Sequence, residues 1–334
     1  MPRPGPRNLI TDVPGLTVGS VQDDDVRTGV TVVLCPEGWS AAVDVRGGGP
    51  GVRETETLSP ENSFSKAHAI CLSGGSVFGL GAADGVVSAL SVNNVGIRLS
   101  PQSPAIPIVP GAVLHDLGNG GDKAWDLEPP YRALGVKAVA AAGQDFPLGA
   151  VGAGRGAMAG LIKGGLGSAS IDLGGGLVVG ALVAANPVGS VYMPDGETFW
   201  AWPFEIDGEF GGRFPTGPVS ATDPLPQESK LGAAGRLRAG ANTTLAVVAV
   251  TADLSTAEAK RVAIMAHDGM GRAVRPAHTA FDGDVVFALA SGAIALGAGP
   301  QRPVEVSRFG SAAADCLARA IARAVYEARA FTES

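Results

Sequence analysis

Apolar residues in this chain gather in short runs that are separated by glycine-rich turns. Runs of this length, rich in β-branched residues and bounded by Gly, Pro, Asn or Asp, are typical of buried strands. They predict strands at residues 16–20, 29–35, 68–72, 107–116, 176–184, 243–251 and 285–290. The pattern changes to a helical period at residues 77–90 and again at 312–330, where Leu317, Ile321 and Val325 share one face.

Another helix is predicted to begin after Ser255. The segment Ser-Thr-Ala-Glu at 255–258 has the spacing of a capping box. In this motif the serine hydroxyl accepts from a backbone N–H of the first helical turn, and the glutamate side chain accepts from the backbone N–H of the serine. We expect this helix to end near Gly269 or Gly271. From residue 243 onward the order is therefore strand, helix, strand, helix, which favours an α/β fold. Residues 204–237 are rich in turn residues and predict an exposed connection.

Composition excludes several classes of protein. The formal net charge of −7 and a pI near 5.2 give no basic surface for nucleic acid. The three cysteines are far apart and form no metal-binding motif, which favours a reducing compartment. The most apolar stretch, residues 177–188, is too short for a membrane span, and no secretory signal precedes residue 9. We expect a cytoplasmic enzyme without metal or cofactor.

Asn242 and Thr243 lie between a segment of small residues and the apolar run that is predicted to form a strand. If the chain were cut between them, the Thr243 hydroxyl would become a nucleophile with its own α-amine as the neighbouring base. The alternative is a β-branched residue that simply opens a strand. Asn186, after another buried run and before Pro187, is placed to donate to an oxyanion or to form an Asx turn.

Eight segments, in the same order as in known enzymes, carry a family resemblance along nearly the whole chain. They are Asp-Val-Arg-Gly-Gly at 44–48, Cys-Leu-Ser-Gly-Gly-Ser-Val-Phe-Gly at 71–79, Ile-Pro-Ile-Val-Pro at 106–110, Gly-Ala-Gly at 152–154, Lys-Gly-Gly-Leu-Gly-Ser-Ala-Ser at 163–170, Asn-Pro-Val-Gly at 186–189, Asn-Thr-Thr-Leu at 242–245 and Asp-Gly-Asp at 282–284. The chain resembles the self-cleaving amidases that include L-aminopeptidase/D-Ala-esterases, β-peptidyl aminopeptidases and nylon-oligomer hydrolases.

This resemblance implies a four-layer αββα sandwich like that of N-terminal nucleophile hydrolases. It implies one domain made as a precursor and cut into residues 1–242 and 243–334. It also implies a small amide or peptide substrate and a homo-oligomer, a tetramer of cleaved protomers, with no nucleic-acid or membrane partner.

The resemblance also implies residue roles. Thr243 matches the nucleophile and Asn186 an oxyanion donor, while Asp282 and Asp284 match the acidic pair of the nylon-oligomer branch. The nylon-oligomer branch has a lysine at the position of Leu161 in this chain. Lys163, two residues further along, is assigned the role of that lysine. Substrate contacts are assigned to Gly75, Ser76 and Phe78, the last at a position where relatives often have tyrosine.

Two further functions stay open at this point. One is an amidase, or an acyl transferase in which an amine resolves the acyl-enzyme, acting on a small metabolite. The other is a glycine-rich ligand-binding protein that is never cleaved. The glycine run at 47–51 is compatible with packed backbone, a loop or a phosphate cradle, although no P-loop lysine follows it.

Overall fold

The computed structural model describes residues 3–218, 223–233 and 242–329. Eleven strands are assigned within these ranges: β1 (Thr17–Asp23), β2 (Thr28–Val45), β3 (Gly51–Arg53), β4 (Lys66–Ser73), β5 (Gly111–Val113), β6 (Met158–Ala159), β7 (Ile162–Lys163), β8 (Gly165–Asp172), β9 (Val178–Asn186), β10 (Thr243–Ala252) and β11 (Val285–Ile294). The α-helices there are α1 (Ala82–Val92), α2 (Tyr131–Ala140), α3 (Lys230–Ala233), α4 (Thr256–Ala273) and α5 (Arg302–Ala328).

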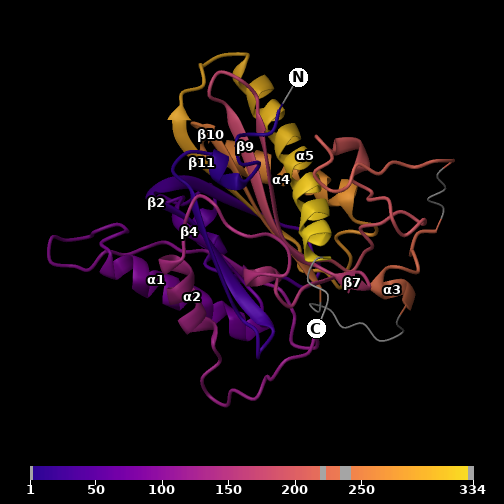
Figure 1. Ribbon diagram of the computed structural model, residues 1–334. Coiled ribbons are helices and arrows are strands. Elements are labelled where there is room, and N and C mark those ends of the chain that lie inside the picture. The colour runs from indigo at the N-terminus through magenta and orange to yellow at the C-terminus, as the bar shows by residue number, and fades with distance from the viewer. Residues whose placement is uncertain (1–2, 219–222, 234–241, 330–334) are drawn as a thin grey trace.

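One hydrogen-bonded sheet supplies both inner layers of the molecule. Its strand order is β3-β5-β4-β2-β11-β10-β9-β8, with β1 beside β2. The first part of the long strand β2 pairs with β1 and β4, and the last part, from Ser40 to Val45, pairs with β11. The register with β4 shifts between Leu34 and Trp39, where β2 passes from one layer to the other. Helices α1 and α2 lie on one side, and α4 and α5 on the other (Figure 1).

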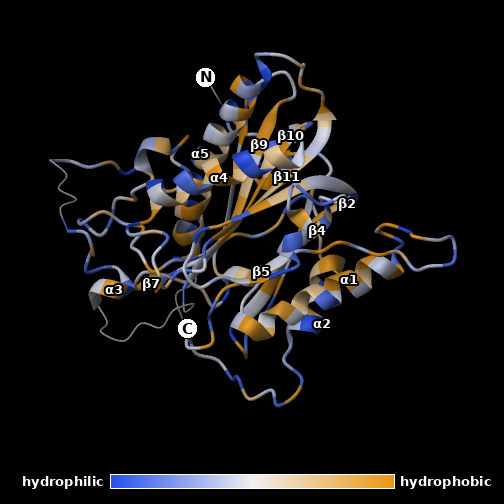
Figure 2. Cartoon of the chain, turned by 180° about the vertical axis from the view of Figure 1, so that it is seen from behind, coloured by the Kyte–Doolittle hydropathy of each residue, from blue (hydrophilic) through white to orange (hydrophobic). Residues whose placement is uncertain are grey.

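Within the described residues, three hydrophobic cores fill the spaces between these four layers. Side chains of β10 alternate between two of them, as the period of a strand requires. Ala246, Val248 and Val250 pack beneath α4 and α5. Leu245 and Val247 face the central core, between the two strand layers. The third core joins α1 and α2 to β2 and β4. Hydrophobic residues are concentrated along the central strands (Figure 2). The four-layer αββα fold is therefore confirmed.

Several elements differ from the sequence-based predictions in their extent. Helix α5 begins at Arg302, ten residues before the expected start, and Pro303 is accommodated because the first helical turn does not need its N–H. Residues 107–116 form only the short strand β5. The helix expected at 77–90 begins as a 3-10 turn, Ser76–Gly81, before α1. The Ser255 capping box is present, but α4 runs on to Ala273 rather than ending at a glycine.

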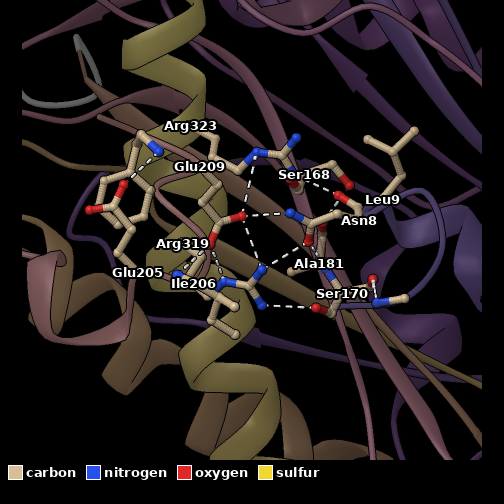
Figure 3. A network of polar contacts seen from close by, with 12 residues as sticks. Asn8, Leu9, Ser168, Ser170, Ala181, Glu205, Ile206, Glu209, Arg319 and Arg323 are labelled. Atoms are coloured by element: carbon tan, nitrogen blue, oxygen red, sulfur yellow. Dashed lines mark hydrogen bonds and ion pairs between the residues drawn. The ribbon is translucent and has the colours of Figure 1, made fainter. Parts of the chain in front are cut away.

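The connection after residue 204 is anchored at its start by a buried ion pair. Arg319 of α5 is fully buried and pairs with Glu209 (Figure 3). The Arg319 guanidinium also donates to the backbone oxygen of Ser170 at 2.8 Å and to Asn8 Oδ1 at 2.9 Å. Because a buried guanidinium is stable only with its hydrogen bonds satisfied, this network ties α5 to segments that precede residue 242.

Candidate active site

Thr243 is the first residue of β10 and is almost completely buried. Its Cα pairs with that of Asn186, the last residue of the neighbouring antiparallel strand β9. On the other side, Asn242 forms a parallel bridge with Asp282, in the loop that leads into β11. Strand pairing therefore brings together four residues that the sequence singled out, although they span almost one hundred positions.

The carbonyl group of Asn242 is held by two donors. The Gly283 N–H donates to the Asn242 carbonyl oxygen at 2.8 Å, and the Thr243 hydroxyl donates to the same oxygen at 2.6 Å. The Thr243 oxygen thus lies against the carbonyl that it would attack. Gly283 was not singled out from the sequence. A Cβ built at this glycine would lie only 2.6 Å from Thr243 Oγ1, so no larger residue fits there without displacement.

The two aspartates on either side of Gly283 hold different parts of the site. Asp284 Oδ1 accepts from the Thr244 N–H at 2.8 Å, and Asp284 Oδ2 lies 2.8 Å from Nδ1 of His278. Asp282 accepts from the Val188 N–H at 3.0 Å and from both the N–H and the hydroxyl of Thr279. Burial raises the pKa of Asp282, and the negative charge of Asp284 raises it further.

Asn186 is fully buried, and both ends of its amide are engaged. Its Oδ1 accepts from the Met158 N–H at 2.9 Å, while its Nδ2 donates to the His115 backbone oxygen at 3.2 Å. This amide connects β9 to the β6–β7 hairpin and to the loop after β5. Lys163, carried over from the resemblance, lies in that hairpin as the Cα partner of Met158. Leu161 is half exposed at the hairpin turn.

Lys230 is a partly buried lysine that sequence reasoning missed. Its Nζ donates to Asn242 Oδ1 at 2.7 Å and to the Met158 backbone oxygen at 2.8 Å. Burial lowers the pKa of Lys230 to about 7, and the negative charge of Asp282 opposes that shift. A single lysine in a turn-rich connection carries no periodic signal, so only the folded chain reveals its burial.

A cavity of about 450 Å³ opens at Thr243. Its lining includes the polar residues Ser76 and His115 and the apolar side chains of Val52, Val77, Leu80 and Val113. Of the three residues assigned to substrate contact, Ser76 lines this cavity. Gly75 precedes Ser76, and its N–H donates to Asp116 Oδ1. Phe78 packs edge-to-face on Trp125, with ring centres 5.4 Å apart. A cavity of about 600 Å³ near Lys66 and His68 lies at the other end of β4.

The glycine run before β3 packs against the aspartate loop. The Gly49 N–H donates to the Asp282 backbone oxygen at 2.8 Å, and a Cβ on Gly47 would lie 2.3 Å from the Asp284 nitrogen. Such close backbone contact accounts for the glycines, and it matches the packed-backbone interpretation rather than a phosphate cradle.

Residues 8–334 match the sequence profile of peptidase family S58. The chain belongs to peptidase family S58. This S58 protein is 45% identical to an uncharacterized aminopeptidase of Mycobacterium tuberculosis (strain ATCC 25618 / H37Rv), over 96% of this chain and 94% of the relative. It is 32% identical to a 6-aminohexanoate-oligomer endohydrolase of Kocuria sp. (strain KY2), over 87% of this chain and 77% of that enzyme. It is an amide-bond hydrolase, as the resemblance implied.

Solved structures share the fold of this S58 hydrolase. A β-aminopeptidase of Burkholderia sp. superposes with a TM-score of 0.68 at 24% identity, covering 97% of this chain and 88% of the other. The L-aminopeptidase D-Ala-esterase/amidase of Ochrobactrum anthropi, described as a new variant of the Ntn hydrolase fold, gives 0.68 at 21% identity, covering 98% and 88%. In the described part of this S58 hydrolase, no helix has the length and apolar character of a membrane span. The described residues contain no cluster of three His, Cys, Asp or Glu suited to a metal ion.

Proposed function

We propose that this S58 hydrolase is made as a precursor that cuts its own Asn242–Thr243 peptide bond. The observation that carries this proposal is the pair of donors on the Asn242 carbonyl oxygen, the Gly283 N–H and the Thr243 hydroxyl. A fixed backbone donor stabilises the negative charge that develops on this oxygen during attack. The adjacent hydroxyl is the group that attacks, so donor and nucleophile are already in place before the reaction begins.

Self-cleavage follows from these positions. Thr243 Oγ1 loses its proton and bonds to the Asn242 carbonyl carbon, while the carbonyl oxygen carries the negative charge against Gly283. The carbonyl then re-forms as the carbon–nitrogen bond breaks, and the Thr243 nitrogen takes up the proton that Oγ1 lost, so that it becomes an amine. The resulting ester links Asn242 to the Thr243 side chain. Water hydrolyses it, which leaves a carboxylate on Asn242 and restores the Thr243 hydroxyl.

The same hydroxyl then acts on substrates. The new α-amine of Thr243 takes the hydroxyl proton, the oxygen attacks a substrate amide, and the amine product leaves an acyl-enzyme that water resolves. The cavity of about 450 Å³ at Thr243 has mixed polar and apolar walls, which suits a short peptide or oligoamide. The names of the relatives, aminopeptidase and 6-aminohexanoate-oligomer endohydrolase, support the same two substrate classes.

Extensive contacts hold the two products of cleavage together. Strands β10 and β11 belong to the segment after the cut, yet they pair with β9 and β2 from the segment before it. The Arg319 network also joins both segments through Glu209 and Asn8 (Figure 3). The cut chains therefore remain one folded unit.

Substitution of the two neighbouring threonines tests this proposal. Thr243→Ala should stay at full length and fail to hydrolyse aminoacyl anilides and 6-aminohexanoate oligomers. Thr244→Ala is the matched control, since it removes a buried hydroxyl one position further along β10. It should still be cut and active. Cleavage or activity in Thr243→Ala would show that another residue is the nucleophile.

A further inference from the structure

Lys230 contacts the residue on the acyl side of the proposed cleavage site. Its Nζ donates to the side-chain oxygen of Asn242 at 2.7 Å, and its second contact, with the Met158 backbone oxygen, fixes the lysine to the β6–β7 hairpin. Burying an ammonium group is unfavourable, and a hydrophobic side chain would fill the same space without that penalty. The polar contact with Asn242 therefore points to a role beyond packing.

Asn242 is held at two separate oxygens. Its backbone oxygen accepts from Gly283 and from the Thr243 hydroxyl, and its side-chain oxygen accepts from Lys230. The Asn242 side-chain nitrogen is buried and has no hydrogen-bond partner among the described groups. Lys230 is thus the group that sets the orientation of this side chain. Fixing the side chain restricts rotation of the residue whose carbonyl carbon faces Thr243.

We propose that Lys230 is a positioning residue for self-cleavage, which selects an amide side chain at position 242 and aligns the scissile carbonyl with Thr243. This inference rests on the proposed self-cleavage. A substrate bound after maturation does not carry the Asn242 side chain. Lys230 therefore acts on the rate at which the precursor is cut, and it has little effect on turnover per cleaved molecule.

A double-substitution cycle on the maturation rate tests this role. Lys230→Met and Asn242→Ala should each slow cleavage about 10- to 100-fold, the range for one hydrogen bond to a charged donor. The double variant should be no slower than the slower single variant, because both substitutions remove the same contact. Lys230→Arg, which keeps a cationic donor, should recover part of the rate. Cleavage is followed on denaturing gels after synthesis of the precursor.

The matched control is Ser229→Ala. The Ser229 hydroxyl accepts from the Gly232 N–H at 3.1 Å and bonds the Pro226 backbone oxygen, so its loss loosens the same segment without touching Asn242. We expect this variant to mature within about threefold of wild type, since it keeps the Lys230–Asn242 contact. If it instead slows as much as Lys230→Met, the lysine acts only by anchoring the segment and the proposal is wrong.

The outcomes separate this inference from the proposed function. If wild-type protein is never cut, self-cleavage itself is wrong. If wild type is cut and Lys230→Met matures at the same rate, or if the two single effects simply add, only the positioning role is refuted. Should Lys230→Met fail to fold, Lys230→Gln, with a shorter polar head, takes its place in the cycle. Turnover per cleaved molecule, measured once each variant has matured, should stay near that of wild type.

Discussion

Replacing Gly283 with alanine should slow maturation about 100-fold through a single added methyl group. The new Cβ would lie 2.6 Å from Thr243 Oγ1 and 2.8 Å from the Gly49 backbone oxygen. Ordinary van der Waals contact begins at 3.4 Å. Relief of the closer overlap needs a movement of about 0.8 Å, and a misplacement near 1 Å lowers a reaction rate by about 10²-fold. Gly283 does not have positive φ, so the effect comes from this contact and not from backbone strain.

The assay is a time course of precursor cleavage for Gly283→Ala. We expect cleavage about 100-fold slower than wild type, with an unfolding temperature lowered only by the modest destabilisation that overpacking causes. Gly271→Ala is the control: Gly271 lies in α4, and its added Cβ meets no atom within 4 Å beyond its chain neighbours and the nearby backbone of its own helix. It should mature at the wild-type rate. A folded Gly283→Ala protein that matures as fast as this control would refute the assigned geometry.

Asn186, the two aspartates and Lys230 can each be tested separately. Asn186→Ala should lower turnover by about 10²–10³-fold, as expected for loss of one oxyanion donor; unchanged steady-state rates would assign this amide to its contacts with Met158 and His115. Asp284→Asn should slow maturation more than Asp282→Asn, because Asp284 accepts from the Thr244 N–H, directly beside Thr243, and equal cleavage rates would contradict that ranking. The pKa of Lys230 is about 7 in the folded chain, below its ordinary value of 10.5. Between these two pH values, Lys230 therefore binds fewer protons in the folded chain than in the unfolded chain. In an uncleaved Thr243→Ala background, the unfolding free energy should therefore rise by about 2 kcal/mol from pH 7 to 9 relative to Lys230→Met; parallel urea-unfolding curves would contradict this.

The parts of the candidate site that carry a local pattern could be proposed from the sequence. Thr243 opens an apolar run and Asn186 closes another, and strand pairing places both at one end of β9 and β10. Asp282 and Asp284 precede the run that becomes β11. The order of the strands in the sheet has no local signal, and the αββα architecture came from resemblance to a family rather than from periodicity.

Two residues of the site were not singled out from the sequence, although Gly283 stands within the Asp-Gly-Asp segment at 282–284. Gly283 is one glycine among 49, and its importance comes from the Thr243 hydroxyl that lies against it in the folded chain. Lys230 stands in a turn-rich connection predicted to be exposed, yet contacts with Met158 and Asn242 partly bury it. Both depend on contacts between segments distant from one another in sequence. Helix α5 and strand β2 exceeded their predicted lengths for a similar reason, since packing against other layers stabilises residues of weaker local pattern.

Self-cleavage is tested most directly by the intact mass of purified wild-type protein under denaturing conditions. We expect two chains, residues 1–242 and residues 243–334, with Thr243 as the free N-terminus of the second. For Thr243→Ala we expect a single chain of 334 residues. An active wild-type enzyme that keeps the mass of the uncut chain would contradict the account.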